Sequence, residues 1–203
     1  MQRTIESAIT AERTPEGAGA TVRRAFPNRH LRTVDPFVLL DEFFLQPPAS
    51  FPPHPHGGFE IVTYIMDGGF RHSDNLGNDR SVTASGLQRI TAGRGIVHAE
   101  MPIGEGLTHG LQLWINLPQR LKGIAPDYQE VPAGQLPEKV QNGARVRTIV
   151  GEGSPVRLQT DVLCLDVTLD PGARAFLDQL REDYQVVILS DTFYEFAHPL
   201  MRQ

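Results

Sequence analysis

The sequence predicts an all-β protein, and three observations lead to this expectation. The 203 residues include 19 glycines and 16 prolines, more than the roughly 7% glycine and 5% proline of average proteins. Turn signals such as DGG, DNLGN, ASG and AGRG recur between residues 51 and 117. Short runs of β-favouring residues fill the intervals between these turns. Strands at this spacing indicate a sandwich or a barrel.

The expected elements follow one another along the chain. Short strands are expected at 3–9 and 20–25, and an apolar segment interrupted by acids covers 34–44. Further strands are expected at 60–66, 87–91, 110–117, 146–150, 157–160 and 162–169. The proline-rich, polar segment 118–140 is interpreted as a connection. A helix at 173–182 and a final strand at 185–190 complete the expectation.

Composition and charge limit the class of protein. A hydrophobic content of 40% is enough for a buried core. With 19 basic and 24 acidic residues the net charge is −5, so we expect no direct sequence-specific binding of nucleic acid. A single cysteine, Cys164, cannot form an internal disulfide and fits a reducing compartment, cytoplasmic or, in a eukaryote, nuclear. No apolar run approaches the roughly 20 residues of a membrane span, and no membrane association is expected.

Two pairs of ligand-capable side chains stand out. His54 and His56 flank Pro55, and His98 and Glu100 follow a glycine-rich turn. On a strand, residues two apart share a face, and a residue before proline is biased toward extended geometry. Three imidazoles and a carboxylate suit a divalent first-row metal in an octahedral site with positions left for water or substrate. The alternative from spacing alone is a surface loop carrying HPH and a core histidine with a satisfied hydrogen bond.

Four motifs resemble the pirin family of bicupins. They are DPFVLLDEF, FPPHPHGGFEIVTYI, TAGRGIVHAEMP and HGLQLWINLP, in order along the chain. The resemblance implies that the residues matching the family's metal ligands, His54, His56, His98 and Glu100, hold Fe(II), with Ni, Cu, Mn or Zn as alternatives. It also implies that the acid of the first motif, Glu60, is not a ligand.

The resemblance implies a cupin, or jelly-roll, β-barrel. We expect an N-terminal metal-binding barrel over residues 3–135 and a partial C-terminal cupin domain over 136–203. The sequence after Ala175 does not resemble the hairpins of a second barrel. An incomplete sheet has an edge that must be covered or paired, and we therefore expect oligomerisation through the C-terminal part.

Two functions from different classes follow from the resemblance. The first is a quercetin 2,3-dioxygenase-like enzyme, which opens a flavonol ring with O2 and releases carbon monoxide, using no catalytic residue beyond the metal ligands. The second is an iron-dependent, redox-sensing transcription co-regulator that binds partners without turnover. For the first function, apolar residues flanking the two pairs are expected to wall a pocket for a planar aromatic ligand: Phe51, Phe59, Ile96, Met101 and Leu113.

Several weaker candidates surround the two pairs. Glu60 lies four residues beyond His56, so on one extended strand it would share the inward face and could hold an imidazole; a surface or turn acid is the alternative. Gln112 and Trp114 alternate, so both could face the cavity, with core packing favoured for Trp114. His72 is expected to have a structural hydrogen-bonding role.

A basic cluster, defined as Arg23, Arg24, Arg29 and Arg32, lies in ten residues of an acidic protein. One interpretation is a solvated strand face and turn. The other is a surface for an acidic or phosphate-rich partner, since guanidinium groups pair with carboxylates and phosphates.

Overall fold

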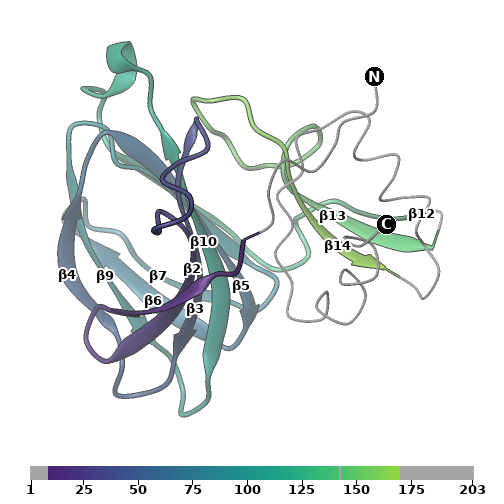
Figure 1. Cartoon of the computed structure of the whole chain (residues 1–203), viewed down its shortest axis with the longest axis horizontal. Coiled ribbons are helices and arrows are strands. Elements are labelled where there is room, and N and C mark those ends of the chain that lie inside the picture. Colours follow the sequence, from purple (N-terminus) through teal and green to yellow (C-terminus); the bar gives the residue numbers. More distant parts are fainter. Residues whose placement is uncertain (1–8, 142, 170–203) are drawn as a thin grey trace.

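The computed structural model describes residues 9–141 and 143–169, and these residues form two facing antiparallel sheets and a third, smaller one (Figure 1). The larger facing sheet has seven strands in the order β1-β2-β3-β10-β5-β8-β11. Their bounds are β1 Glu12–Glu16, β2 Ala20–Phe26, β3 Phe37–Leu45, β5 Phe59–Asp67, β8 Leu87–Thr91, β10 Thr108–Asn116 and β11 Asp127–Val131.

The sheet opposite has four strands in the order β4-β9-β6-β7. Their bounds are β4 Phe51–His56, β6 Gly69–Asp74, β7 Asp79–Thr83 and β9 Ile96–Pro102. Strand β4 is an edge strand, as expected for a strand that contains proline. The expectation of an all-β protein is confirmed, and the two sheets enclose the interior of a barrel.

The third sheet has three strands in the order β12-β13-β14, beside the barrel in Figure 1. Its strands are β12 Glu138–Gln141, β13 Ala144–Val150 and β14 Cys164–Leu169. It shares a core with the outer face of the seven-stranded sheet, where Val62, Leu87 and Ile115 pack in one cluster with Ile149 and Val150. The expected domain boundary at 135 falls between β11 and β12, and it stays a prediction.

Inward and outward faces of the seven-stranded sheet follow the alternation of side chains along each strand. Ile61 and Ile65 of β5 belong to clusters of the barrel interior. Val62 and Tyr64, one residue displaced, pack in the cluster shared with the third sheet. The continuous apolar run of β5 is therefore explained by burial on both faces.

Two sequence-based expectations are wrong within the described residues. The segment 118–140 is more than a connection, because it contains the short 3-10 helix η1 (Gln119–Leu121) and strand β11, which pairs with β8. Residues 157–160 form no strand. Instead, the backbone N–H of Gln159 donates to the Glu60 carboxylate.

Three expectations fall wholly or largely outside the described residues: the strand at 3–9, the helix at 173–182 and the strand at 185–190. Among the residues that the structure describes, no helix is long and apolar enough to cross a bilayer.

Candidate metal centre

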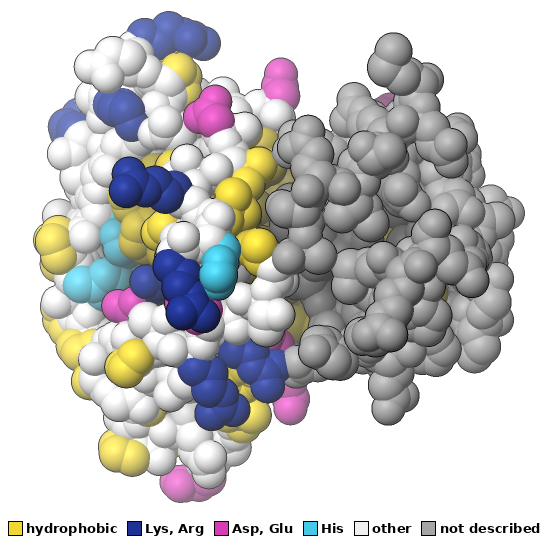
Figure 2. Space-filling model, viewed as in Figure 1, with side chains coloured by type: hydrophobic (Ala, Val, Ile, Leu, Met, Phe, Trp, Pro, Cys, Tyr) yellow, Lys and Arg dark blue, Asp and Glu magenta, His cyan; other side chains and the backbone are white. Residues whose placement is uncertain are grey.

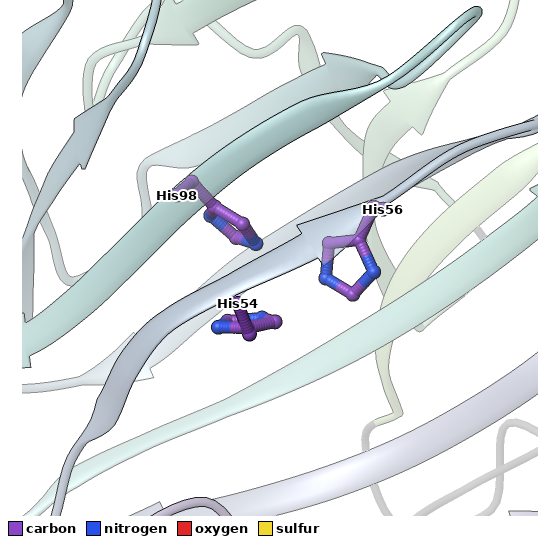
Figure 3. A group of neighbouring side chains, drawn as sticks. All are labelled: His54, His56 and His98. Carbon is purple, nitrogen blue, oxygen red and sulfur yellow. The ribbon is translucent and has the colours of Figure 1, made fainter.

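Strands β4 and β9 bring three of the four predicted ligands together inside the barrel. The strands are antiparallel, and their register places His54 opposite His98 and His56 opposite Ile96. The ring centroid of His98 lies 4.4 Å from that of His54 and 5.0 Å from that of His56. One ring nitrogen from each of the three histidines lies within 4.8 Å of the others. Figure 3 shows the three imidazoles converging on one region between the strands.

The turns before and after these strands fix their relative position. The turn after β4 contains Gly58, whose backbone N–H donates to the carbonyl of Gly93 in the turn before β9 (2.8 Å). Gly93 has a φ of +50°, and a Cβ at this residue would collide with the carbonyl oxygen of Ile124. Glycine is the residue that tolerates both constraints. The glycine-rich turns of the two motifs therefore hold the two pairs of candidate ligands in register.

Burial keeps the imidazoles of His56 and His98 neutral. His98 is 1% exposed, and burial first, then the neighbouring imidazoles of His54 and His56, lowers its pKa to about 2. Burial and His54 lower the pKa of His56 to about 4. The neutral imidazole is the form that binds a metal.

Hydrogen bonding leaves ligand atoms of the centre available. The Nδ1 of His54 lies 2.7 Å from the carbonyl oxygen of Pro52, which sets a tautomer with a free Nε2 lone pair. The Nε2 of His98 is buried and has no hydrogen-bond partner within the described part of the chain. Buried polar atoms in proteins are nearly always paired, so this nitrogen indicates a metal ion as its partner. The donor set fits a divalent first-row metal.

Glu100, the fourth predicted ligand, lies in a neighbouring group. Ligand atoms of Glu100, His72 and His98 lie within 4.8 Å of one another, and the Oε1 of Glu100 is 3.9 Å from the Nδ1 of His98. The side-chain amide of Gln88, on β8, donates to the same Oε1. Burial raises the pKa of the Glu100 carboxyl to about 7, against the effect of the Gln88 hydrogen bond. The structure thus places the carboxylate beside His98 and not in the same group as His54 and His56.

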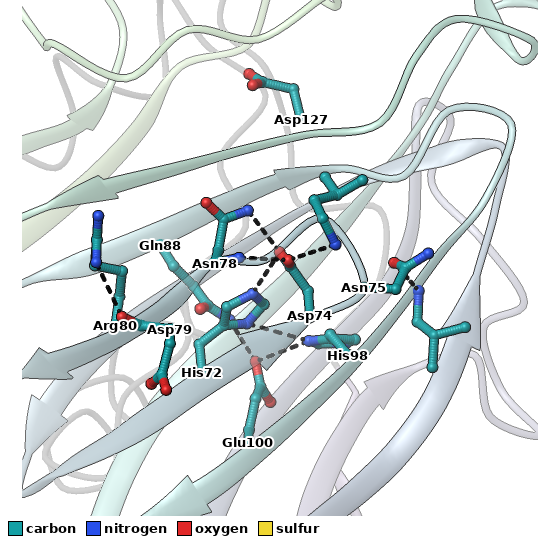
Figure 4. A network of polar contacts seen from close by, with 12 residues as sticks. His72, Asp74, Asn75, Asn78, Asp79, Arg80, Gln88, His98, Glu100 and Asp127 are labelled. Carbon is teal, nitrogen blue, oxygen red and sulfur yellow. Dashed lines mark hydrogen bonds and ion pairs between the residues drawn. The ribbon is translucent and has the colours of Figure 1, made fainter.

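Two residues with buried side chains, His72 and Asp74, lie behind the centre, and the sequence analysis did not assign them to it (Figure 4). The Nε2 of His72 lies 2.9 Å from the Asp74 carboxylate, and the Nδ1 of His72 lies 3.4 Å from the Nδ1 of His98. The expected hydrogen-bonding role of His72 is confirmed. The register of β6 with β9 creates these contacts, because it places His72 opposite Glu100 and Asp74 opposite His98.

The expectation that Glu60 holds an imidazole is wrong. A turn at residues 57–58 separates it from His56, so the two side chains do not lie on one strand. Glu60 shares the face of β5 that turns away from the barrel interior, and it is fully buried. Its carboxylate accepts hydrogen bonds from the hydroxyl of Thr91 (2.7 Å) and from the backbone N–H of Gln159 (2.8 Å). The alternative of a surface acid is therefore wrong as well.

Trp114 lies beside the centre, and Gln112, two residues earlier on β10, contacts Trp114. The indole N–H of Trp114 donates to the side-chain oxygen of Gln112 (2.9 Å). The indole stacks on Phe59 with centroids 4.4 Å apart and meets His56 edge-on at 4.9 Å. Trp114 is thus part of an aromatic wall beside a candidate ligand, rather than of the core alone.

Of the five residues expected to wall a pocket, Phe59 contacts a candidate ligand, with its centroid 5.4 Å from that of His56. The outward positions on β9 alternate with His98 and Glu100, so Met101 is 46% exposed. Leu113 packs on the outer face of the seven-stranded sheet. The remaining two pack in apolar clusters: Phe51 and Ile96.

Ion pairs within the chain neutralise much of the basic cluster. Arg24 makes a bidentate pair with Asp41 (2.9 and 2.7 Å). Arg23 lies 3.3 Å from a Glu42 oxygen, and Arg29 lies 2.8 Å from a carboxylate oxygen of Glu12. On the face shown in Figure 2, basic side chains lie in several separate groups over the barrel, some with acidic side chains beside them. A partner surface at this cluster stays a prediction.

Comparison with known proteins places the chain in a family. The model of the pirin family matches residues 19–115. Pirin-like protein 2 of Arabidopsis thaliana is 46% identical over 178 residues, which cover 86% of this chain and 55% of that protein. Pirin of Homo sapiens is 43% identical over 175 residues, which cover 84% of this chain and 60% of that protein. The chain belongs to the pirin family.

The chain therefore spans 55% and 60% of the length of these two pirins. Solved structures also resemble it. Quercetin 2,3-dioxygenase from Acinetobacter baumannii has a TM-score of 0.72 and 28% identity, covering 79% of this chain and 56% of that one. GK1651 from Geobacillus kaustophilus has a TM-score of 0.75 and 31% identity, covering 85% and 70%. The cupin fold expected from the sequence is confirmed.

A bacterial pirin from Escherichia coli, YhhW, solved in complex with nickel(II), matches with a TM-score of 0.57 and 21% identity, covering 68% of this chain and 67% of that one. At this level of identity the likeness supports the shared fold. The candidate ligands of the present chain are identified from the positions of its own side chains.

Proposed function

We propose that this pirin is a metal-dependent oxidoreductase of the quercetin 2,3-dioxygenase type, with Fe(II) at the centre. The observation that carries the proposal is the buried Nε2 of His98, which has no partner among the described residues and converges with two other imidazoles beside an aromatic wall. The similarity to a quercetin 2,3-dioxygenase at 28% identity supports the same reaction class.

The residues that would hold the ion are His54, His56, His98 and Glu100. When bound, a divalent metal supplies Lewis acidity, which lowers the pKa of a coordinated hydroxyl group, and iron also supplies redox chemistry with O2. Four protein ligands would leave coordination positions open for a substrate.

The protein side chains would orient the substrate. The stacked rings of Phe59 and Trp114 offer a flat apolar surface next to His56, and aromatic faces of this kind favour planar aromatic ligands. The side-chain oxygen of Gln112 accepts a hydrogen bond from the indole N–H of Trp114 and holds the indole in place. The wall would therefore set the ring plane of a flavonol relative to the imidazoles.

Glu100 would also handle the proton of the substrate hydroxyl. The raised pKa of its buried carboxyl group, about 7, belongs to the metal-free protein; in the loaded protein the carboxylate oxygen that does not bind the ion would accept the proton. Its Oε1 accepts the hydrogen bond from Gln88, which leaves Oε2 for this proton or for the metal.

The test is oxygen-dependent loss of quercetin absorbance with protein loaded anaerobically with Fe(II), together with oxygen uptake and release of carbon monoxide. Glu100→Ala and His56→Ala should abolish the reaction, and both should lose metal. His30→Ala changes an exposed histidine far along the chain from the pairs and should keep full activity. Because free iron oxidises flavonols slowly, every sample carries the same total iron.

Equal rates with the original protein and with His56→Ala would contradict the enzyme proposal. Redox-dependent binding of a protein partner would then replace it. The basic cluster would be the first surface to mutate in that case.

A further inference from the structure

Asp74 is held as an acceptor in the hairpin between β6 and β7. Its Oδ1 accepts the backbone N–H groups of Leu76 (2.9 Å) and Asn78 (3.0 Å). Its Oδ2 accepts the side-chain amide of Asn78 (2.8 Å) and lies 2.9 Å from the Nε2 of His72. A carboxylate is an acceptor only. The Nε2 of His72 must therefore carry the proton of this bond.

The proton on Nε2 determines what His72 offers to His98. A neutral imidazole with one protonated nitrogen accepts at the other, so the Nδ1 of His72 is an acceptor. The Nδ1 of His98 lies 3.4 Å from it and is the donor of this contact. The Oε1 of Glu100 is a farther acceptor, at 3.9 Å, and already accepts from Gln88.

We propose that Asp74 and His72 form a relay that fixes His98 as the Nδ1–H tautomer, so that its Nε2 presents a lone pair to the metal. The buried Nε2 of His98, unpartnered among the described side chains, is the atom that this tautomer leaves bare. Metal-ligating histidines generally donate their second N–H to an outer group that fixes the tautomer. Here that group is a second imidazole, itself fixed by a carboxylate.

Packing holds the relay in place. The side chains of His72 and Asp74 have no solvent exposure. The ring of Tyr128, from β11, stacks on His72 with centroids 4.3 Å apart and an interplanar angle of 17°. Both nitrogens of His72 are engaged, one by Asp74 and one by His98, so His72 is a positioning residue rather than a fifth ligand.

The first test reads the tautomer directly in metal-free protein carrying 15N-labelled histidine. Two-bond 1H–15N correlation spectra distinguish protonated from unprotonated ring nitrogens. We expect His98 to be protonated at Nδ1 and bare at Nε2. His72→Phe keeps the ring stack but removes the acceptor, so the Nε2–H form of His98 should appear. His72→Asn, whose amide oxygen can lie near the former Nδ1, should keep the original tautomer.

The second test is affinity for Ni²⁺, measured by competition with a chelating dye. The Ni²⁺ affinity rests on the proposed metal centre, whereas the tautomer of His98 is measured in metal-free protein and does not rest on it. His72→Phe should weaken Ni²⁺ binding by about 10- to 100-fold, and His72→Asn should restore most of it. Asp74→Asn keeps the size of the side chain but releases the tautomer of His72, and should act like His72→Phe. His30→Phe is the matched control and should change neither readout.

The outcomes are distinguishable. His98 protonated at Nε2 in the original metal-free protein would overturn the relay, whatever the variants do. Loss of Ni²⁺ in both His72 variants with an unchanged His98 tautomer would make His72 a ligand and also overturn it. If the original protein shows the expected tautomer but binds no Ni²⁺, the proposed function fails while the relay stands. If His72→Phe does not fold, the spectra of the original protein and of Asp74→Asn carry the test.

Discussion

Replacing Glu100 by glutamine should change how the stability of the metal-free protein depends on pH. The carboxyl group of Glu100 is 1% exposed and pairs with an amide rather than with a cation. Burial raises its pKa from 4.5 to about 7, because a charge is poorly solvated in the barrel interior. Glutamine has nearly the same shape and never carries this charge.

The magnitude follows from the shift in pKa. The folded protein binds this proton more tightly than the unfolded chain, so the group stabilises the fold below its unfolded pKa, and the stabilisation is lost as pH rises through about 7. One pKa unit corresponds to about 1.4 kcal/mol. Between about pH 5 and about pH 8 the contribution of Glu100 to the unfolding free energy should fall by roughly 2.5 kcal/mol.

The assay is urea denaturation of both proteins, freed of metal, at several pH values. Neutral, buried His56 and His98 act in the opposite direction, since their lowered pKa values cost stability as pH falls below 6.5. The quantity to compare is therefore the difference between the original protein and Glu100→Gln, in which the histidine contributions largely cancel. Glu105→Gln, at an exposed position, is the control. A difference that stays constant from about pH 5 to about pH 8 would refute a raised pKa for Glu100.

Two further predictions, one on packing and one on an ion pair, each with a control variant, can be tested by urea denaturation. Gly110→Ala should lose about 3 kcal/mol, because its Cβ would lie 2.5 Å from the Tyr64 carbonyl oxygen; Gly106→Ala, with open space around it, should be nearly neutral, and equal effects would contradict the geometry. Arg24→Ala should cost about 3 kcal/mol by leaving the buried Asp41 carboxylate unpaired. Arg29→Ala, at an exposed ion pair, should cost less than about 1 kcal/mol. A small loss in Arg24→Ala would show that water or another cation replaces the guanidinium.

The strands with strong local signals could be predicted from the sequence. The expected strand at 87–91 coincides with β8, and that at 60–66 lies within β5. Strand β11 could not be predicted, since its sequence DYQEV is polar and follows a proline-rich stretch. It is a strand because it pairs with β8 and buries Val131. Tertiary contacts, rather than local propensity, decide such a segment.

The candidate ligands could be predicted in part, because side chains two apart share a face of a strand. That rule places His54 with His56, and His98 with Glu100. It fails for Glu60, where a turn intervenes. It also could not find Gln88, whose contact with Glu100 depends on how β8 of one sheet faces β9 of the other.

Burial alone does not distinguish the metal centre from the other polar sites of the barrel. Asp41 and Glu60 are also buried, but Arg24 satisfies the first and Thr91 with the Gln159 backbone satisfies the second. The surroundings of His98 differ from these two sites because they contain buried polar atoms without a hydrogen-bond partner in the described part of the chain. Five buried side-chain atoms of the described residues have no hydrogen-bond partner, and three of them belong to His98 and its surroundings: the Nε2 of His98, the side-chain oxygen of Gln88 and the hydroxyl of Tyr128. Unpaired buried polar atoms cost stability, so their grouping around His98 supports the proposed metal centre.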